Sequence, residues 1–367
     1  EDVDATILQD GGEDINEMET EENARKGTIS SARFNLLSTM VGGGSLSLPM
    51  AFQKSGNALM APLLLLLITA LSDFVFRLLI TCAPPSVGIG RGNSSYGTIT
   101  ETAFGRRGYV ISTVLVFIMC YFGVVAYAVL LRDMLEPISD AIFPSDSRLY
   151  RNISMYIVVL LVTPLCSLRT ITSLERFGAA GMFSIFILGC CVVFRSVQCN
   201  YQHPDGWHTH LRLFPEKPMD VFDALPIIIS CYFCHYNVPL AYNDMQNPTK
   251  QRVSWWLRST TWGAAIYYWI IGMAGSMYGV CVASGEVQGN ILLDFGENDP
   301  LLLVGRLCLA FTLSMAFPLL VIPARDVIWI SMCELVNGSA RSNVESNELE
   351  EPLLDAEEGQ DDEKGKC

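Results

Sequence analysis

The chain has 367 residues, of which 50% are hydrophobic and only 17% are charged. Soluble domains usually contain about a quarter of charged residues, and several apolar runs here are long enough to cross a bilayer. The composition therefore excludes an ordinary soluble domain, and it contains no basic patch typical of nucleic-acid-binding proteins. Much of the net charge of −14 comes from the two ends of the chain, where acidic tails are expected.

The predicted organisation is an acidic tail over residues 1–28, a membrane domain over 29–336 and a second acidic segment over 337–367. Lys and Arg are more numerous in the loops that a cytoplasmic N-terminus would place inside, which predicts this orientation and cytoplasmic tails. About eight membrane spans are expected. They cover residues 31–54, 58–80, 109–131, 153–168, 177–197, 221–242, 259–283 and 301–323.

The first span contains three consecutive glycines, Gly42, Gly43 and Gly44, which are followed by Ser45 and Pro49. In a helix interior each glycine costs about 1 kcal/mol relative to alanine, and proline costs about 3 kcal/mol. Unpaired backbone groups at membrane depth are tolerated only where they face protein or a water-filled cavity. The run predicts a helix that is broken at a binding site, although a packing face or a simple kink stays open.

Two residues of opposite charge, Asp73 and Arg77, lie near the end of the second span. Their spacing places them on one helical face, where they could form an ion pair. Because both lie near the membrane surface, extension of each side chain toward water is the simpler interpretation.

The sixth span has an unusually polar centre, which includes Tyr232, Cys234, His235 and Asn237, and which ends at Pro239. Polar residues at such depth usually face a cavity or a partner. Proline lacks a backbone donor and is expected to disrupt the turn before it. A first and a sixth span that are both interrupted suggest corresponding members of two repeats, which favours a secondary transporter.

Three stretches resemble the amino acid/auxin permease family, close to its sodium-coupled neutral amino acid transporters and vacuolar amino acid transporters. They are the glycine run of the first span, the run Phe233-Cys234-His235-Tyr236-Asn237-Val238-Pro239 with its following loop, and Phe317 to Arg325. The resemblance covers about residues 28–336 and implies a leucine-transporter-like, all-α fold of two inverted five-helix repeats, usually with an eleventh helix. Because only about eight spans are found, we expect a chain truncated after the eighth helix, which bears on its transport activity.

An amino acid substrate, which the resemblance implies, presents a carboxylate and an ammonium group. The N-terminus of a half-helix offers unpaired N–H groups to a carboxylate, and glycine allows close approach to the backbone. Backbone carbonyl groups freed at the breaks would face the ammonium. The predicted substrate-binding residues are Gly42, Gly43, Gly44 and Ser45 for the carboxylate, with Thr39, Tyr232, Cys234, His235 and Asn237 around the freed carbonyls. The lining carries no net charge, which favours neutral substrates.

The resemblance also implies an ion site between the first and eighth helices, where Ser38, Thr312 and Ser314 supply hydroxyl groups. Sodium-coupled members tend to have an asparagine near the position of Ser38. The serine at this position weakens the case for sodium coupling without removing it. A histidine titrates near neutral pH unless it is perturbed, so His235 could couple transport to protons or sense pH. A hydrogen bond from His235 to a freed carbonyl is the alternative. No cofactor is expected beyond a coupling ion, Na⁺ or H⁺.

Twelve cysteines do not predict a disulfide framework, since many lie in apolar spans, where cysteine behaves as a small hydrophobic residue. The loop after the fifth span carries Cys199, His203, His208 and His210. Their loose spacing could form an exposed metal site, although ordinary loop residues are the simpler interpretation.

The leading hypothesis is secondary active transport of neutral amino acids in a vacuolar, lysosomal or plasma membrane. Acidic residues before Leu353 and Leu354 resemble a sorting signal, which favours an internal, acidic compartment. The alternative is an amino acid sensor or scaffold that signals through its cytoplasmic tail. An enzyme is not expected, because no nucleophile–base pair or phosphate-binding loop is found. The expected partners are the amino acid substrate and the lipid bilayer.

Overall fold

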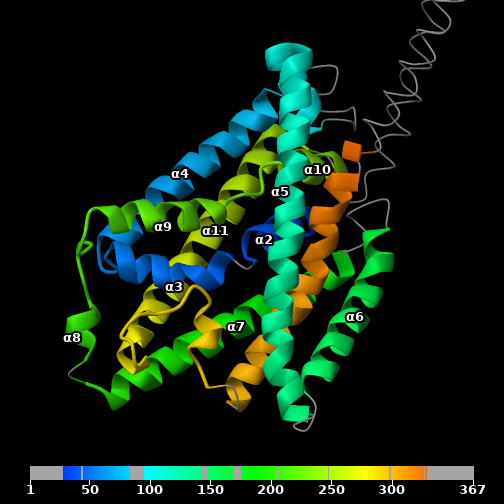
Figure 1. Cartoon of the computed structure of the whole chain (residues 1–367). Coiled ribbons are helices and arrows are strands. Elements are labelled where there is room, and N and C mark those ends of the chain that lie inside the picture. Colours follow the sequence, from blue (N-terminus) through cyan, green and yellow to red (C-terminus); the bar gives the residue numbers. More distant parts are fainter. Residues whose placement is uncertain are drawn as a thin grey trace, which may run out of the picture. The chain divides into compact units, whose positions relative to one another are not determined.

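The computed structural model describes residues 28–42, 44–82, 95–142, 147–167, 175–204, 206–246, 248–296, 299–325 and 327–328. Gly43, the dileucine sequence and, apart from Thr28, both predicted acidic tails lie outside the described residues. The chain divides into a unit over residues 1–323, which holds nearly all of the described residues, and a unit over residues 324–367. The described part of the first unit is mostly helical, as Figure 1 shows.

The first predicted span consists of two helices, α2 (Ile29–Met40) and α3 (Gly44–Ser55). The hydroxyl of Thr28 caps α2 by accepting a hydrogen bond from the N–H of Ser31 at 3.1 Å. Helix α2 ends where Val41 leaves helical geometry, with a ψ of 61°. The predicted break is therefore present at the glycine run, whereas Pro49 lies inside α3 and does not end it.

The sixth predicted span is also divided, into α9 (Met219–Ser230) and α10 (Asn237–Asp244), with irregular backbone over residues 231–236. Pro239 is the third residue of α10, in the first turn, where a backbone N–H has no partner within the helix. The backbone before Pro239 is thus irregular, as the sequence predicts, and Pro239 itself lies at the beginning of the new helix.

Each of the other predicted spans overlaps one helix, although the ends of the helices differ from the predicted bounds by up to 13 residues. By length and composition, five helices in the described part of the chain could cross a membrane, and the apolar stretch of α6 is shorter. With the two divided helices they form an all-α polytopic membrane protein. The helices are α4 (Met60–Thr81), α5 (Tyr96–Ile142), α6 (Ser147–Cys166), α7 (Glu175–Gln202), α11 (Lys250–Met277) and Pro300–Arg325.

Helix α5 begins earlier than the sequence predicts, inside the expected linker. Gly105 interrupts its regular geometry with a φ of 72°, in the left-handed region that favours glycine. The residues before Gly105 therefore form a separate segment that leads into the span. The shorter connecting elements are α8 (Trp207–His210), η2 (Tyr278–Cys281) and η3 (Ile291–Leu293).

Helix α11 packs against α2, α3, α4 and α7 (Figure 1). Two of its glycines allow α3 to approach the α11 backbone closely. A Cβ atom at Gly272 would lie 2.6 Å from ring atoms of Phe52, and one at Gly275 would lie 2.4 Å from Cγ of Pro49. Any side chain at these positions would collide with α3, so the two glycines fix how closely α3 and α11 can pack.

Candidate functional site

The two helix breaks lie against each other. The amide Nδ2 of Asn237, at the start of α10, donates a hydrogen bond to Oγ1 of Thr39, near the end of α2, at 3.0 Å. A Cβ atom at Gly44 would lie 3.3 Å from Sγ of Cys231. Helix α3 also packs against α9, and α10 packs against α2. Of the predicted substrate residues, the structure thus brings Thr39, Gly44 and Asn237 to one place.

The glycine run is covered by Tyr127 of α5, a residue that was not predicted from the sequence. A Cβ atom at Gly42 would lie 2.3 Å from the Tyr127 hydroxyl oxygen, so only glycine fits beneath this ring. The ring of Tyr127 also packs edge-on against Phe317 of the helix Pro300–Arg325, with 6.0 Å between centroids. Tyr127 thus connects the first break to the eighth predicted span. A tyrosine in an apolar span gave no signal of this contact.

Ser45 closes the turn at the start of α3. Its Oγ donates a hydrogen bond to the backbone oxygen of Gly42 at 2.8 Å, and its N–H approaches the same oxygen at 3.2 Å. The Gly42 carbonyl is therefore engaged within the chain. The remaining N–H groups in the first turn of α3 have no partners within the helix, which is the usual condition of a helix N-terminus.

Two hydroxyl groups on neighbouring helices form hydrogen bonds with residues of the second break. The hydroxyl of Tyr268 in α11 donates to the backbone oxygen of Cys231 at 2.9 Å. Thr69 in α4 donates its only hydroxyl hydrogen to the oxygen of Leu65 at 2.6 Å, so Tyr232 must be the donor in its 2.7 Å contact with Thr69. Cys231 and Tyr232 therefore have defined partners on α11 and α4.

Two buried asparagines, one inside α2 and one at the start of α10, carry amide oxygens that have no hydrogen-bond partner among the described residues. They are Oδ1 of Asn35, one turn before Thr39, and Oδ1 of Asn237. Both residues are almost fully buried, and an unpaired buried acceptor costs about 1–3 kcal/mol. A ligand that donates hydrogen bonds would relieve this cost. Asn35 was not among the predicted site residues, although an asparagine inside an apolar span is itself a signal.

Two other predicted substrate residues lie at the second break. Cys234 is fully buried. His235 lines a cavity of about 750 Å³ together with residues of α4 and α5. Its ring centroid lies 4.8 Å from that of Phe76 and 5.8 Å from that of Phe233. No hydrogen bond of the His235 ring is found among the described residues, so the alternative of a bond to a freed carbonyl gains no support.

The three predicted ion ligands make hydrogen bonds within their own helices. Ser38 donates to the oxygen of Asn35 at 3.3 Å, Thr312 to Cys308 at 2.9 Å and Ser314 to Ala310 at 2.7 Å. Ser38 and Thr312 are almost fully buried. Each hydroxyl oxygen keeps acceptor capacity for a cation, and the ion site stays a prediction.

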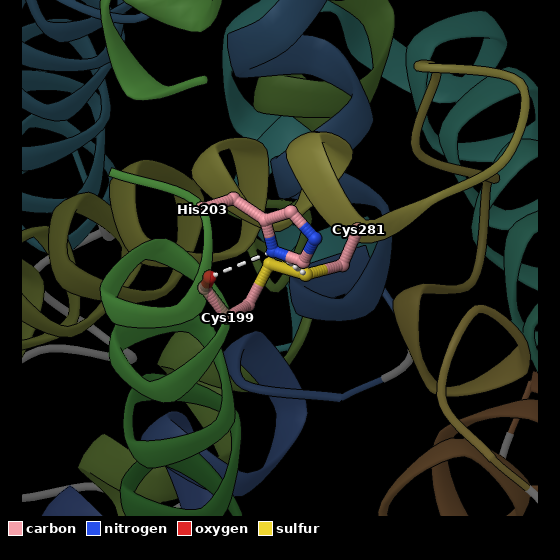
Figure 2. Close-up of side chains that lie close together, drawn as sticks. All are labelled: Cys199, His203 and Cys281. Carbon is pink, nitrogen blue, oxygen red and sulfur yellow. Dashed lines mark hydrogen bonds between the residues drawn. A yellow bond between two sulfur atoms is a disulfide. The ribbon is translucent and has the colours of Figure 1, made fainter. Parts of the chain in front are cut away.

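Cys199, at the start of the predicted histidine-containing loop, forms a disulfide that the sequence did not predict. Cys199, near the end of α7, is joined to Cys281 at the end of η2, as Figure 2 shows. Nδ1 of His203 lies 3.3 Å from the backbone oxygen of Cys199 and 3.6 Å from Sγ of Cys281. Both sulfur atoms are used in the disulfide and are not thiolate ligands. Neither His208 nor His210 joins this group within the described part of the chain.

An ion pair also ties α7 to the start of the helix Pro300–Arg325. It joins Arg195 to Asp299. Burial alone would raise the pKa of Asp299, but the hydrogen bonds from Arg195 and from the N–H of Leu301 outweigh burial and lower this pKa below its usual value. Asp299 is therefore ionised at neutral pH. In the connection between α7 and α9, burial and the charge of Arg212 lower the pKa of His210.

Comparison with known proteins gives one family over most of the chain. The family model described as transmembrane amino acid transporter protein matches residues 25–351. Proteins named putative sodium-coupled neutral amino acid transporter 11 are 25% identical over 308 residues in Danio rerio and 26% over 307 residues in Bos taurus. Each alignment covers 82% of this chain, and 65% and 62% of the two relatives.

A fungal relative gives the same result. Vacuolar amino acid transporter 2 of Saccharomyces cerevisiae is 23% identical over 327 residues, which cover 86% of this chain and 65% of that protein. The chain therefore spans a little less than two thirds of the length of these relatives. All of them are named as transporters, and none is named as an enzyme.

Proposed function

The chain belongs to the transmembrane amino acid transporter family, and on that premise we propose that it carries out secondary active transport of neutral amino acids. The observation that carries the proposal is the hydrogen bond between Thr39 and Asn237, which joins the two helix breaks at 3.0 Å. Secondary transporters hold their substrates where two discontinuous helices meet near the middle of the membrane. The same pair of breaks supports a leucine-transporter-like arrangement of inverted repeats.

The substrate carboxylate would bind at the N-terminus of α3. The first-turn N–H groups and the positive end of the helix dipole favour an anion there. Gly44 lets Cys231 pack against this terminus, since a Cβ atom there would be only 3.3 Å from its sulfur. The carboxylate would therefore approach the first-turn N–H groups from a side that Cys231 does not cover.

The substrate ammonium would bind at the opposite side of the breaks. The C-terminal end of α2 carries the negative end of its dipole. The unpartnered oxygens of Asn35 and Asn237 supply acceptors that are already desolvated. A neutral amino acid fits this arrangement, because its two charged groups are matched and no charged side chain lies among the predicted lining residues.

The coupling ion would be sodium or a proton. Ser38, Thr312 and Ser314 are the proposed sodium ligands, and all three hydroxyl oxygens retain acceptor capacity. His235 is the proposed proton-binding group. The relatives include proteins named as sodium-coupled and proteins named as vacuolar, and gradients of the two ions imposed one at a time distinguish them.

The disulfide supports the proposed orientation. Disulfides persist in oxidising compartments and are rare in the cytosol. Cys199 follows the fifth predicted span and Cys281 follows the main part of the seventh, so a cytoplasmic N-terminus places both on the outer or luminal side. A vacuolar, lysosomal or plasma membrane satisfies this requirement.

The test is uptake of radiolabelled neutral amino acids into proteoliposomes that contain the full chain, with proton and sodium gradients imposed separately. Asn237→Ala is expected to lower uptake about tenfold to a hundredfold, because it removes a hydrogen bond to a charged group. Asn200→Ala is the matched control, since Asn200 also has a buried, unpartnered oxygen but bonds to Ser196 and Met277 instead. Amino acid binding without uptake under either gradient would refute transport and favour a sensor.

A further inference from the structure

We propose that this protein binds an anionic phospholipid of the cytoplasmic leaflet in a cavity between α4 and α11. The cavity has a volume of about 720 Å³. It is lined chiefly by Asp73 and Arg77 of α4 and by Trp255, Arg258, Ser259 and Trp262 of α11. These residues lie near the end of α4 and near the beginning of α11, which are the cytoplasmic ends of both helices in the proposed orientation.

The cavity carries an excess of positive charge. Arg33 of α2 reaches it, because its guanidinium lies 4.0 Å from the ring centroid of Trp255 and donates to Oγ of Ser259 at 2.9 Å. Arg77 is paired with Asp73. Arg258 is exposed and has no ion-pair partner among the described residues. Three arginines therefore meet one carboxylate, which leaves a net charge of +2 for an anionic headgroup.

Two buried polar atoms at this place have no hydrogen-bond partner within the part of the chain that the structure describes. Nε of Arg33 is a donor without an acceptor, and Oδ1 of Asp73 is an acceptor without a donor. The Asp73 residue is 4% exposed, so water satisfies it poorly. A headgroup that contains a phosphate and a hydroxyl or primary ammonium group offers acceptors to the arginines and a donor to the Asp73 carboxylate of the lining. Choline contains no such donor, so the site is expected to select against phosphatidylcholine.

The surface around the cavity favours a lipid over a free anion. Trp255 and Trp262 are 56% and 38% exposed, and indole rings concentrate at membrane interfaces. Ile266 and Trp269 continue the same face of α11 beyond Trp262 at helical spacing and are also exposed. An acyl chain could therefore lie along this face while the phosphate occupies the arginine-lined cavity.

The test measures lipid binding directly and does not depend on transport. The purified full chain in detergent would be mixed with equal amounts of phosphatidylinositol and phosphatidylcholine, and bound lipid would be quantified by native mass spectrometry. We expect phosphatidylinositol to be retained preferentially. Arg258→Gln is expected to lower its affinity about fivefold, the effect of one basic residue near the membrane surface. Because Arg258 is exposed, the substitution should leave folding intact.

Lys250→Gln is the matched control, because it removes one positive charge from the exposed start of the same helix, outside the cavity. Unchanged binding by this variant supports the site. Equal losses for the two variants would show general attraction to a positive surface and would overturn the proposal. Equal retention of phosphatidylinositol and phosphatidylcholine would also overturn the proposal. Inorganic phosphate and glycerophosphoinositol form a second arm, and displacement of the lipid by either at an equal concentration would refute a lipid as the source of the phosphate.

Discussion

Removal of the Cys199–Cys281 disulfide should destabilise the protein measurably. The bond closes a segment with a sequence separation of 82 residues. For a loop of this length, the chain-entropy model gives about 4.5 kcal/mol at 25 °C. The spans inside this loop stay helical in a membrane environment, so the unfolded chain is already restricted and the effect is smaller. We expect the variant Cys199→Ser to lose about 2–3 kcal/mol of unfolding free energy.

The folded state should survive this substitution. The amide of Asn200 donates to the backbone oxygen of Met277 at 3.3 Å, and Ser196 donates to the backbone oxygen of Ala274. Both contacts hold the end of α7 to the end of α11 without the disulfide. The main effect of the substitution should therefore be on the unfolded chain.

The assay is reversible unfolding in mixed micelles, followed by circular dichroism at increasing concentrations of sodium dodecyl sulfate. Cys82→Ser is the matched control, because Cys82 is an exposed free cysteine. Equal stabilities of the two variants would refute the reasoning, as would maleimide labelling of Cys199 and Cys281 in unreduced protein. In sealed vesicles of known orientation, labelling after reduction by membrane-impermeant reagents should occur only from the outer or luminal side.

Three further outcomes are expected. Gly42→Ala should displace Tyr127, because the hydroxyl oxygen of Tyr127 would lie 2.3 Å from the new Cβ. The substitution should cost about 1–3 kcal/mol of stability in the same unfolding assay. Unchanged stability and unchanged substrate binding would contradict the contact. A double-mutant cycle of Thr39→Ala and Asn237→Ala should give a coupling energy of about 0.5–1.5 kcal/mol, and additive effects would show that the breaks are not joined there. Asp299→Asn should lower thermal stability at neutral pH, because the folded state holds the Asp299 pKa below 3.8. That difference should shrink as the pH falls through the lowered pKa, and a difference that grew in acid would show the wrong sign.

Sequence patterns identified the features that depend on local backbone chemistry. The glycines from Gly42 to Gly44 predicted a break, and α2 and α3 meet at these residues. Apolar runs of membrane length predicted the continuous spans. Pro239 predicted a disturbed turn, and the backbone before it is irregular over residues 231–236. Whether it ends one helix or lies in the first turn of the next depends on its neighbours.

Long-range contacts could not be predicted in the same way. Thr39 and Asn237 are 198 residues apart in the sequence, and neither side chain identifies the other. Tyr127 matters because α5 passes directly over Gly42, which depends on the packing of whole helices. Twelve cysteines allow many pairings, so the bond between Cys199 and Cys281 follows only when the ends of α7 and α11 are placed together.

The close packing of α3 against α11 has a consequence for substrate affinity. Pro49 and Phe52 leave no space above Gly275 and Gly272, so a larger residue at either glycine of α11 would displace α3. The first turn of α3, where we propose that the carboxylate binds, precedes Pro49 on the same helix and would shift with it. We expect a small enlargement at Gly275 to change substrate affinity by tilting that turn. Mutational surveys of substrate selectivity should accordingly include the glycines of α11 as well as the residues that touch the substrate.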